Sequence, residues 1–401
     1  MNSSNQSALL LCQIGFESWG GSEIVSLELI EWFTARGWRV DLFTTAFGAP
    51  IAEAVTDKVK AGSLRVVTLG SDHELDAHAY ELIWVNQSLI PRSIVAQLAN
   101  DPVTTPVVWH HMSSFQHLGL PLLYEVEHAL ASVITCMAPV AQDRMREYGF
   151  PGHDIELFDN PAPDEFVFHE RRIPRSALRT ILVVSNHPPV ELRDAAAILT
   201  ARGIVMEFAG LSDSYGRITP QRIAKHDAVV TIGKTTQYAL VMGVPVYSYD
   251  HFGGGGWILE KNLESEWYGN FAGRIARRVL SAEHIAEELE QGFGSAQAFA
   301  QASREASVGR WSLTRQLETL LADSRLARAP RSLNAGQVKL AVLQCAMRDE
   351  LWGALRQAQR DVRQLRGSVD HPLETVRKQE GKQGGSVAQR WRSLSMWRRS
   401  R

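Results

Sequence analysis

The chain of 401 residues contains few cysteines, no long apolar run and no excess of positive charge. Its three cysteines, Cys12, Cys136 and Cys345, lie far apart and form no C-x-x-C pair. This pattern argues against a disulfide framework and against a zinc cluster, and it favours a reducing cytoplasm. The net charge of −2 gives no reason to expect nucleic acid as a partner.

Segments that would carry the chain into or across a membrane are also missing. No run of ~18 apolar residues, the length that spans a bilayer, occurs anywhere in the sequence. The first residues, MNSSNQSALLLCQIGF, lack the basic segment and the long apolar core of a signal peptide. We therefore expect a cytoplasmic protein that is soluble or rests on a membrane surface.

Several motifs that hold metals or perform hydrolysis are absent. The sequence has no D-x-D, so nothing predicts a metal held by that carboxylate pair against a nucleotide diphosphate. It has no HExxH, no GxSxG and no cysteine–histidine pairing that would indicate a hydrolase. We expect neither a bound metal nor a cofactor.

The chain does contain an alternation of short β-branched runs with helical stretches. The helix expected at residues 22–36 has apolar residues at helical spacing and ends at Gly37. Strands separated by helices indicate a parallel sheet with helices on both faces. The strands expected in the first half are residues 9–14, 39–45, 64–69, 81–86, 106–111, 131–136 and 154–160.

The same pattern restarts after a stretch that contains Pro161, Pro163 and Pro174. Two successive units of this kind predict an α/β protein with two Rossmann-like domains that face each other across a cleft. We expect domains over residues 1–162 and 163–325 and a helical extension over 326–401. The further elements expected are strands at 180–185, 204–210, 227–233 and 245–250, and helices at 189–202, 235–242 and 338–365.

Glycine turns at two predicted helix starts are candidate ligand sites. Gly20 and Gly21 precede the first helix, where a backbone can approach a ligand and helix N–H groups attract anions. The second turn combines a glycine, a lysine cation and two threonine hydroxyls, which suits a diphosphate. A plain capped turn is the alternative for both. The candidates in the second turn are Gly233, Lys234, Thr235 and Thr236.

Three further candidate groups lie at the ends of predicted strands. The S-N-H-P-P segment at 185–189 is expected to point into the cleft, and the W-H-H segment at 109–111 offers an imidazole that can contact a sugar or act as a base. The four glycines of 253–256 cost conformational entropy, which favours a loop that closes around a ligand. Structural roles are the alternatives. The candidates are Asn186, His187, Phe252, Gly253 and Gly254 for the donor, and His110, His111 and His251 for catalysis.

Two stretches resemble the GT-B glycosyltransferases, especially the retaining, family-4-like enzymes (glycosyl transferases group 1) of bacterial polysaccharide assembly. Residues 20–44, GGSEIVSLELIEWFTARGWRVDLFT, look like the first βαβ unit of that family. Residues 227–257, DAVVTIGKTTQYALVMGVPVYSYDHFGGGGW, look like its donor half. The resemblance extends over residues 8–320 or so.

The resemblance implies a metal-independent hexosyltransferase that moves a sugar from a nucleotide sugar to a polysaccharide or lipid-linked glycan. The nucleotide sugar would sit mainly on the second domain and the acceptor on the first. By position, Gly20 and Gly21 would lie beneath the donor phosphates or the acceptor, and residues 233–236 would hold the donor phosphates. His110 or His111 would match the histidine that contacts the sugar.

One departure from the family pattern concerns its acidic residues. The family usually carries two glutamates eight positions apart before a G-x-P-V turn, and this chain has Val230 and Tyr238 there. Sugar or ribose hydroxyls must then be held differently. Two alternatives remain open: a nucleotide-sugar 2-epimerase of similar fold, and a non-catalytic scaffold that recruits other enzymes through residues 338–366.

The end of the chain is basic. Residues 371–401 carry a net charge of +6, which leaves −8 on residues 1–370. Residues 387–401 combine Trp391 and Trp397 with five arginines, a composition that suits the headgroup zone of an anionic membrane. We expect peripheral binding on the inner face of the cell membrane, with a solvated tail as the alternative.

Overall fold

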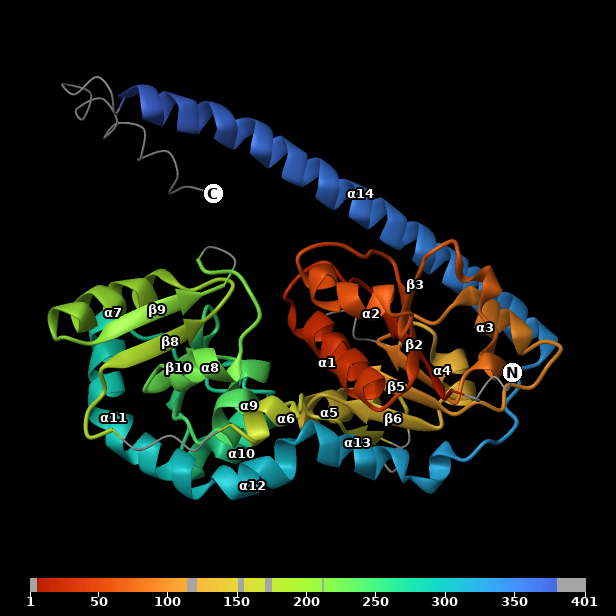
Figure 1. The fold of residues 1–401 in the computed structure, drawn as a ribbon, viewed down its shortest axis with the longest axis horizontal. Coiled ribbons are helices and arrows are strands. Elements are labelled where there is room, and N and C mark those ends of the chain that lie inside the picture. The colour runs from red at the N-terminus through yellow and green to blue at the C-terminus, as the bar shows by residue number, and fades with distance from the viewer. Residues whose placement is uncertain (1–5, 114–120, 151–154, 170–174, 211–212, 381–401) are drawn as a thin grey trace. The chain divides into compact units, whose positions relative to one another are not determined.

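A computed structural model describes residues 6–113, 121–150, 155–169, 175–210 and 213–380. The chain divides into two compact units, Met1–Ala346 and Met347–Arg401. The first unit contains two α/β lobes, each built around its own sheet (Figure 1). The two Rossmann-like domains expected from the sequence are therefore confirmed.

The first lobe contains a seven-stranded parallel sheet in the order β3-β2-β1-β4-β5-β6-β7. Successive residues of the interior strand β1 enter different cores: Leu9 and Leu11 pack on one face, and Leu10 and Cys12 on the other. Burial on both faces explains why these strands are continuously apolar. The strands are Ala8–Gln13 (β1), Arg39–Thr44 (β2), Leu64–Thr68 (β3), Leu82–Asn86 (β4), Val107–His111 (β5), Val133–Cys136 (β6) and Ile155–Leu157 (β7), all within the predicted ranges to one residue.

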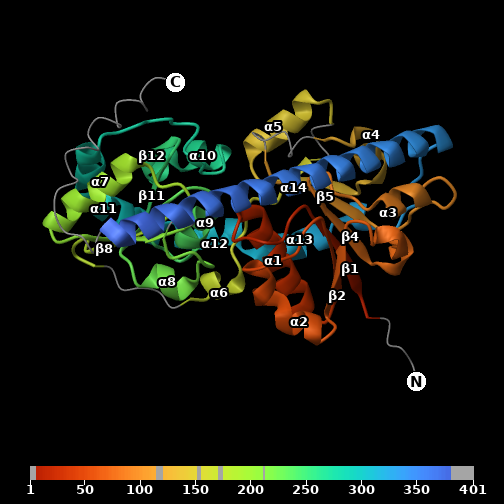
Figure 2. The ribbon, with the colours of Figure 1, turned by 90° about the horizontal axis from the view of Figure 1, so that it is seen from above.

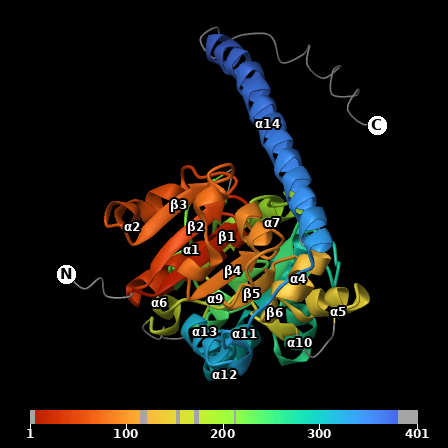
Figure 3. The same cartoon turned by 90° about the vertical axis from the view of Figure 1, so that its right-hand side faces the viewer.

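Helices cover this sheet on both sides. Figure 3 shows α2 on one side of the strands and α4 and α5 on the other. The longest of them, α1, begins at the predicted glycine turn and carries Leu27, Ile30 and Phe33 into the core. The helices of this lobe are Gly21–Ala35 (α1), Thr56–Lys60 (α2), Arg92–Gln97 (α3), Tyr124–Leu130 (α4) and Pro139–Glu147 (α5).

The second lobe contains a five-stranded sheet in the order β12-β11-β10-β8-β9. Four strands are parallel, and the edge strand β12 runs antiparallel to β11. Figure 2 shows α7 beside α11 at one end of this lobe. The strands are Thr180–Val184 (β8), Val205–Ala209 (β9), Ala228–Thr231 (β10), Val246–Asp250 (β11) and Gly253–Trp257 (β12); the helices are Val190–Ala201 (α7), Pro220–Ala224 (α8), Lys234–Val241 (α9), Glu260–Tyr268 (α10) and Ala282–Ala302 (α11).

The expectation that the four glycines form a loop is wrong, because they form strand β12. A β-carbon on Gly254 would lie 1.8 Å from the carbonyl oxygen of Ser248, and one on Gly253 would lie 2.3 Å from that of Arg278. Any side chain at either position would therefore collide with neighbouring backbone. Close packing of the edge strand accounts for these glycines.

The chain crosses between the lobes twice. It leaves the first sheet after β7, enters the second lobe at Asp164–Val167 (α6) and returns through Arg304–Trp311 (α12) and Leu313–Leu321 (α13). Leu313, Leu317 and Leu320 pack in the core of the first lobe, although we expected them in the domain 163–325. Figure 1 shows α11, α12 and α13 following one another along the lobes.

Helix α14, Ala335–Glu380, follows and contains the helix expected at 338–365. Its first turns carry Val338, Ala341 and Cys345 into the core of the first lobe. In the described part of the chain no helix is both long and apolar enough to cross a membrane. The basic segment 387–401 lies outside the described residues.

Candidate functional site

A cavity of about 480 Å³ lies between the two lobes. On the second lobe it is lined by residues that follow β8, β9, β10 and β11, at the carboxyl ends of the strands. Strands β8 and β10 are neighbours, and the chain continues from β8 to one side of the sheet and from β10 to the other. Open α/β sheets bind their ligands at such a switch point, and the volume suits a small organic molecule.

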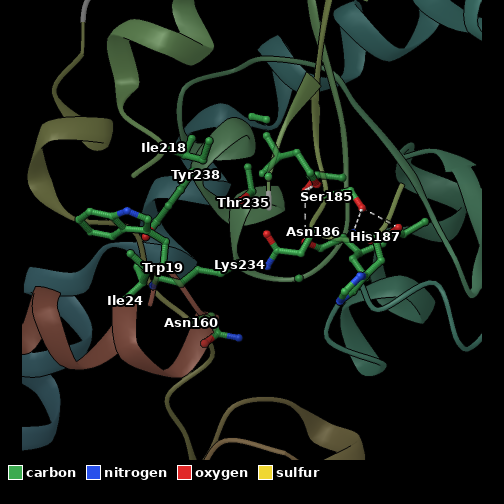
Figure 4. Close-up of a pocket in the computed structure, with 18 of the residues that line it drawn as sticks. Trp19, Ile24, Asn160, Ser185, Asn186, His187, Ile218, Lys234, Thr235 and Tyr238 are labelled. Atoms are coloured by element: carbon green, nitrogen blue, oxygen red, sulfur yellow. Dashed lines mark hydrogen bonds between the residues drawn. The ribbon is translucent and has the colours of Figure 1, made fainter. Parts of the chain in front are cut away.

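A hydrogen-bonded network forms the second-lobe wall of this cavity. The Ser185 hydroxyl donates to the Asp250 carboxylate at 2.8 Å and accepts the backbone N–H of His187 at 3.0 Å. His251 donates its backbone N–H to the same Asp250 oxygen at 2.8 Å. The rings of His187 and His251 meet edge to face with centroids 5.9 Å apart. The buried Asp250 thus brings two imidazoles, predicted separately, to one side of the cavity. Figure 4 shows Ser185 and His187 next to one another on this wall.

The start of α9 opens into the cavity beside this wall. Gly233, Lys234 and Thr235 line it, and Gly233 adopts φ +64°, a conformation that suits glycine. The first N–H groups of a helix have no partner within the helix and favour negative charge. The turn therefore presents backbone donors to the cavity.

The Lys234 side chain is already engaged within the protein. Its Nζ lies 2.8 Å from the Glu28 carboxylate of α1 and donates to the Pro161 carbonyl at 2.7 Å. Tyr238, one turn later on α9, donates its hydroxyl to the same carboxylate. The ammonium thus contacts the other lobe, whereas we expected it to face a diphosphate.

Burial sets the electrostatics of this contact. Desolvation raises the pKa of Glu28 and lowers the pKa of Lys234, and the attraction between the two groups opposes both changes. Burial also raises the pKa of Tyr238, so its hydroxyl stays protonated and donates to Glu28. A buried pair of this kind fixes geometry, and removal of one partner is costly.

The first lobe contributes the start of α1 to the cavity. Trp19, Gly21, Ser22 and Ile24 line it, and the turn is held by the Glu23 carboxylate, which accepts the backbone N–H groups of residues 17, 18 and 20. The backbone N–H of Trp19 donates across the cavity to the Tyr215 hydroxyl at 2.9 Å. Figure 4 shows Trp19 and Ile24 on the side of the cavity away from Asn186 and His187.

Further contacts between the lobes surround the cavity. Arg217 lines it and donates two hydrogen bonds to Glu31 of α1, at 2.7 and 2.9 Å. Asn160, at the first crossing, donates to Asn270 at 2.8 Å, and both line the cavity with positive φ. The cavity walls are therefore held by side chains from both lobes.

The structure places both histidines of strand β5 away from the cavity, which corrects their candidate catalytic role. The His110 side chain is 0% exposed, and its Nδ1 shares a hydrogen bond with Thr135 Oγ1 at 2.9 Å. Its ring packs edge-on against Trp84 and Phe158. His111 lies 2.5 Å from the buried Glu127 carboxylate. Because β5 is an interior strand with helices on both faces, its alternating side chains enter two cores.

Burial also determines how these histidines titrate. Desolvation lowers the pKa of His110 to about 3, so its ring stays neutral near pH 7. Its Nε2 is buried with no hydrogen-bond partner among the described residues. Burial raises the pKa of Glu127, with the neighbouring His111 opposing it.

Other predicted donor residues also lie outside the cavity lining. Phe252 packs against His251 with the rings tilted by 46° and their centroids 3.7 Å apart, and Thr236 is fully buried. Gly253 and Gly254 belong to strand β12, and Gly20 precedes α1 without lining the cavity. The predicted residues that do line it are Gly21, Asn186, His187, Gly233, Lys234, Thr235 and His251.

Sequence reasoning missed several cavity residues. Trp19 directly precedes the candidate Gly20, and Asp250 directly precedes the candidate His251, so their sequence positions gave a signal for both. Tyr215, Arg217 and Asn270 follow no recognisable pattern. They reach the cavity only through the way the two lobes meet.

No protein-family model and no curated protein matches the chain. Solved structures do. Anabaena Alr3699/HepE in complex with UDP and glucose is 14% identical with a TM-score of 0.52, over 79% of this chain and 100% of that chain. A glycosyltransferase from Rickettsia africae ESF-5 is 12% identical with a TM-score of 0.51, over 79% of this chain and 97% of that chain. These similarities and the two facing sheets show that the chain has the GT-B fold.

Proposed function

We propose that the chain is a glycosyltransferase that uses a nucleotide sugar as donor. The observation that carries this proposal is the convergence on one interlobe cavity of the α9 N-terminus and the residue pairs 186–187 and 250–251. Backbone donors and imidazoles at the carboxyl ends of parallel strands are suited to a diphosphate and sugar hydroxyls. The structural neighbour HepE was crystallised with UDP-glucose, which makes that donor the first to test.

In the proposed reaction the bond between the anomeric carbon and the diphosphate oxygen breaks, and an acceptor hydroxyl forms the new bond to that carbon. The leaving nucleoside diphosphate takes the electron pair, and its oxygen accepts the proton that the acceptor hydroxyl loses. The N–H groups at the start of α9 stabilise the developing negative charge, and no metal takes part. His251, whose Nδ1 lies 3.4 Å from Asp250, donates to the diphosphate or the sugar.

This assignment gives Lys234 a different role from the one the sequence suggested. Its ammonium holds Glu28 and Pro161, so it positions the start of α9 against the first lobe. Replacement of Lys234 by Ala then lowers turnover and donor affinity together, because the whole turn loses its support. A Lys234→Ala variant that loses stability as well as donor affinity would support this positioning role. A loss of donor affinity at unchanged stability would indicate direct contact between Lys234 and the phosphate.

The finer features of the proposal follow the family resemblance. We expect transfer of a hexosyl group with retention of anomeric configuration to a glycan or lipid-linked acceptor. Trp19 and Ile24 give the first-lobe wall an apolar surface for that acceptor. We further propose a cytoplasmic enzyme that binds the inner face of the cell membrane through residues 387–401. Equal flotation with anionic liposomes of the whole chain and of a chain lacking 387–401 would contradict the last point.

A thermal-shift screen of nucleoside diphosphates and their sugars tests the donor, because a ligand that prefers the native state raises the melting temperature. We expect a stabilising donor, followed by acceptor-dependent release of its nucleoside diphosphate in the presence of EDTA. Conversion of the donor to its 2-epimer without an acceptor would identify the epimerase alternative. Failure of every nucleotide to stabilise the protein would contradict the proposal.

A further inference from the structure

Helix α14 carries a stripe of exposed apolar side chains along one face. The six members are between 42% and 69% exposed, whereas such residues are usually buried. We name them the α14 stripe. They are Leu340, Leu343, Met347, Leu351, Leu355 and Val362.

The spacing places these residues on one face. Leu340, Leu351 and Val362 recur every eleven residues, which is close to three turns of an α-helix. The other members fall three or four residues from these positions and stay on the same side. Ala354 and Ala358, also exposed, continue the face between the larger side chains.

Five of the six stripe residues are arranged symmetrically about Leu351, and the sixth, Leu343, has Gln359 at its mirror position. Leu340 and Val362 lie eleven residues before and after it, and Met347 and Leu355 lie four residues before and after it. Two copies of the helix in antiparallel orientation would therefore pair Leu351 with itself, Met347 with Leu355 and Leu340 with Val362. A face of this kind fits a second copy of itself, as a two-fold interface requires.

Charges beside the stripe favour the same orientation. Lys339 and Asp361 are exposed, and they lie on the same edge because 22 residues, two eleven-residue repeats, separate them. In an antiparallel pair, the same edge of each helix faces the partner. Lys339 would therefore lie near Asp361 of the partner subunit, two residues from the position directly opposite, and the two-fold symmetry would repeat this contact at the other end of the pair. Glu350 would lie near Glu350 of the partner subunit at the centre, a like-charge contact at an exposed position.

We propose that the α14 stripe is a homodimer interface in which two copies of the helix pair antiparallel around Leu351. The proposal is independent of the glycosyl transfer suggested above. The pairing extends over 23 residues from Leu340 to Val362, or about 33 Å of helix.

Sedimentation of the full chain over a range of concentrations tests the pairing. We expect a dimer that Leu351→Glu dissociates, with a dissociation constant raised at least about 100-fold because a carboxylate enters an apolar contact. Gly353→Glu, which adds the same charge at an exposed position on the opposite side of the helix, is the matched control and stays dimeric. Glu350→Gln tightens the dimer about 2-fold by removing a like-charge contact. A monomer up to about 100 μM, or a dimer that Leu351→Glu leaves intact, would overturn the proposal.

Cysteine crosslinking tests the orientation, since the three native cysteines are buried. Leu351→Cys should form a disulfide with its own copy. Leu340→Cys alone should not, whereas the double variant Leu340→Cys/Val362→Cys should. Self-crosslinking of Leu340→Cys would demonstrate parallel pairing and contradict the antiparallel register.

Discussion

Histidines and glycines stand both inside strands and just after strand ends in this protein, and the two settings give them different roles. His111 and Gly254, inside strands, face a buried carboxylate and a neighbouring carbonyl. His187 and Gly233, which follow strand ends, line the interlobe cavity. Residue type alone did not separate these groups. Their position relative to the strand end separates them, because the backbone and its side chains leave the core just after a strand ends.

The largest difference between the two settings should appear in stability. Replacement of His111 by Ala leaves Glu127 buried without its partner, and we expect the free energy of unfolding to fall by about 3 kcal/mol. Urea denaturation measures this loss, and His187→Ala in the cavity should change it by less than about 0.5 kcal/mol. Equal losses in the two variants would remove the distinction between the settings.

Glycines provide a second contrast. Gly254→Ala places a β-carbon against the Ser248 carbonyl, so we expect a loss of about 2 kcal/mol or failure of strand β12 to pair. A β-carbon on Gly21, at the start of α1, meets nothing within 4 Å. Gly21→Ala should therefore keep the melting temperature of the parent. An unchanged melting temperature in Gly254→Ala would contradict the packing explanation.

For ligand binding we expect the opposite order, with larger effects from substitutions in the cavity than from substitutions inside strands. We expect His251→Ala and His187→Ala each to weaken UDP-glucose binding about 10-fold, or about 1.4 kcal/mol, in a calorimetric titration. His284→Ala, an exposed histidine of α11, is the matched control and should bind as the parent does. Parent-like affinity in both cavity variants would place the donor elsewhere.

The last contrast concerns the dependence of stability on pH. The folded-state pKa of His110, about 3, lies below its ordinary value of about 6.5, so only the unfolded chain gains this proton between those values. Its stabilising contribution is complete above pH 6.5 and declines as the pH falls toward 3, by up to about 1.4 kcal/mol per pH unit. His110→Gln should flatten the dependence of unfolding free energy on pH between 5 and 6.5. Identical slopes in parent and variant would show that His110 titrates normally in the folded protein.

The fold could be predicted from the sequence because it rests on local patterns. Apolar runs such as residues 180–185 and glycine helix ends such as Gly37 mark the elements of both sheets without knowledge of their neighbours. The exception was β12, since a run of glycines carries no strand signal. Its conformation depends on the Ser248 and Arg278 carbonyls, which are close only in the folded protein.

The site was predicted less completely, because it depends on how the lobes meet. Lys234 looked like a free cation beside a glycine turn, and nothing nearby in sequence indicated Glu28 as its partner. Arg217 and Asn270 reach the cavity through similar long-range contacts. Asn186, His187 and His251 were found because they directly follow strands.

A crystal structure of the chain with UDP would decide whether the interlobe cavity binds the donor. We expect a diphosphate in this cavity, accepting hydrogen bonds from the backbone N–H groups of Lys234 or Thr235, with His187 or His251 in contact and the Lys234 ammonium still on Glu28. A diphosphate bound outside this cavity, or one that takes Lys234 away from Glu28 and leaves the α9 amides unused, would contradict it.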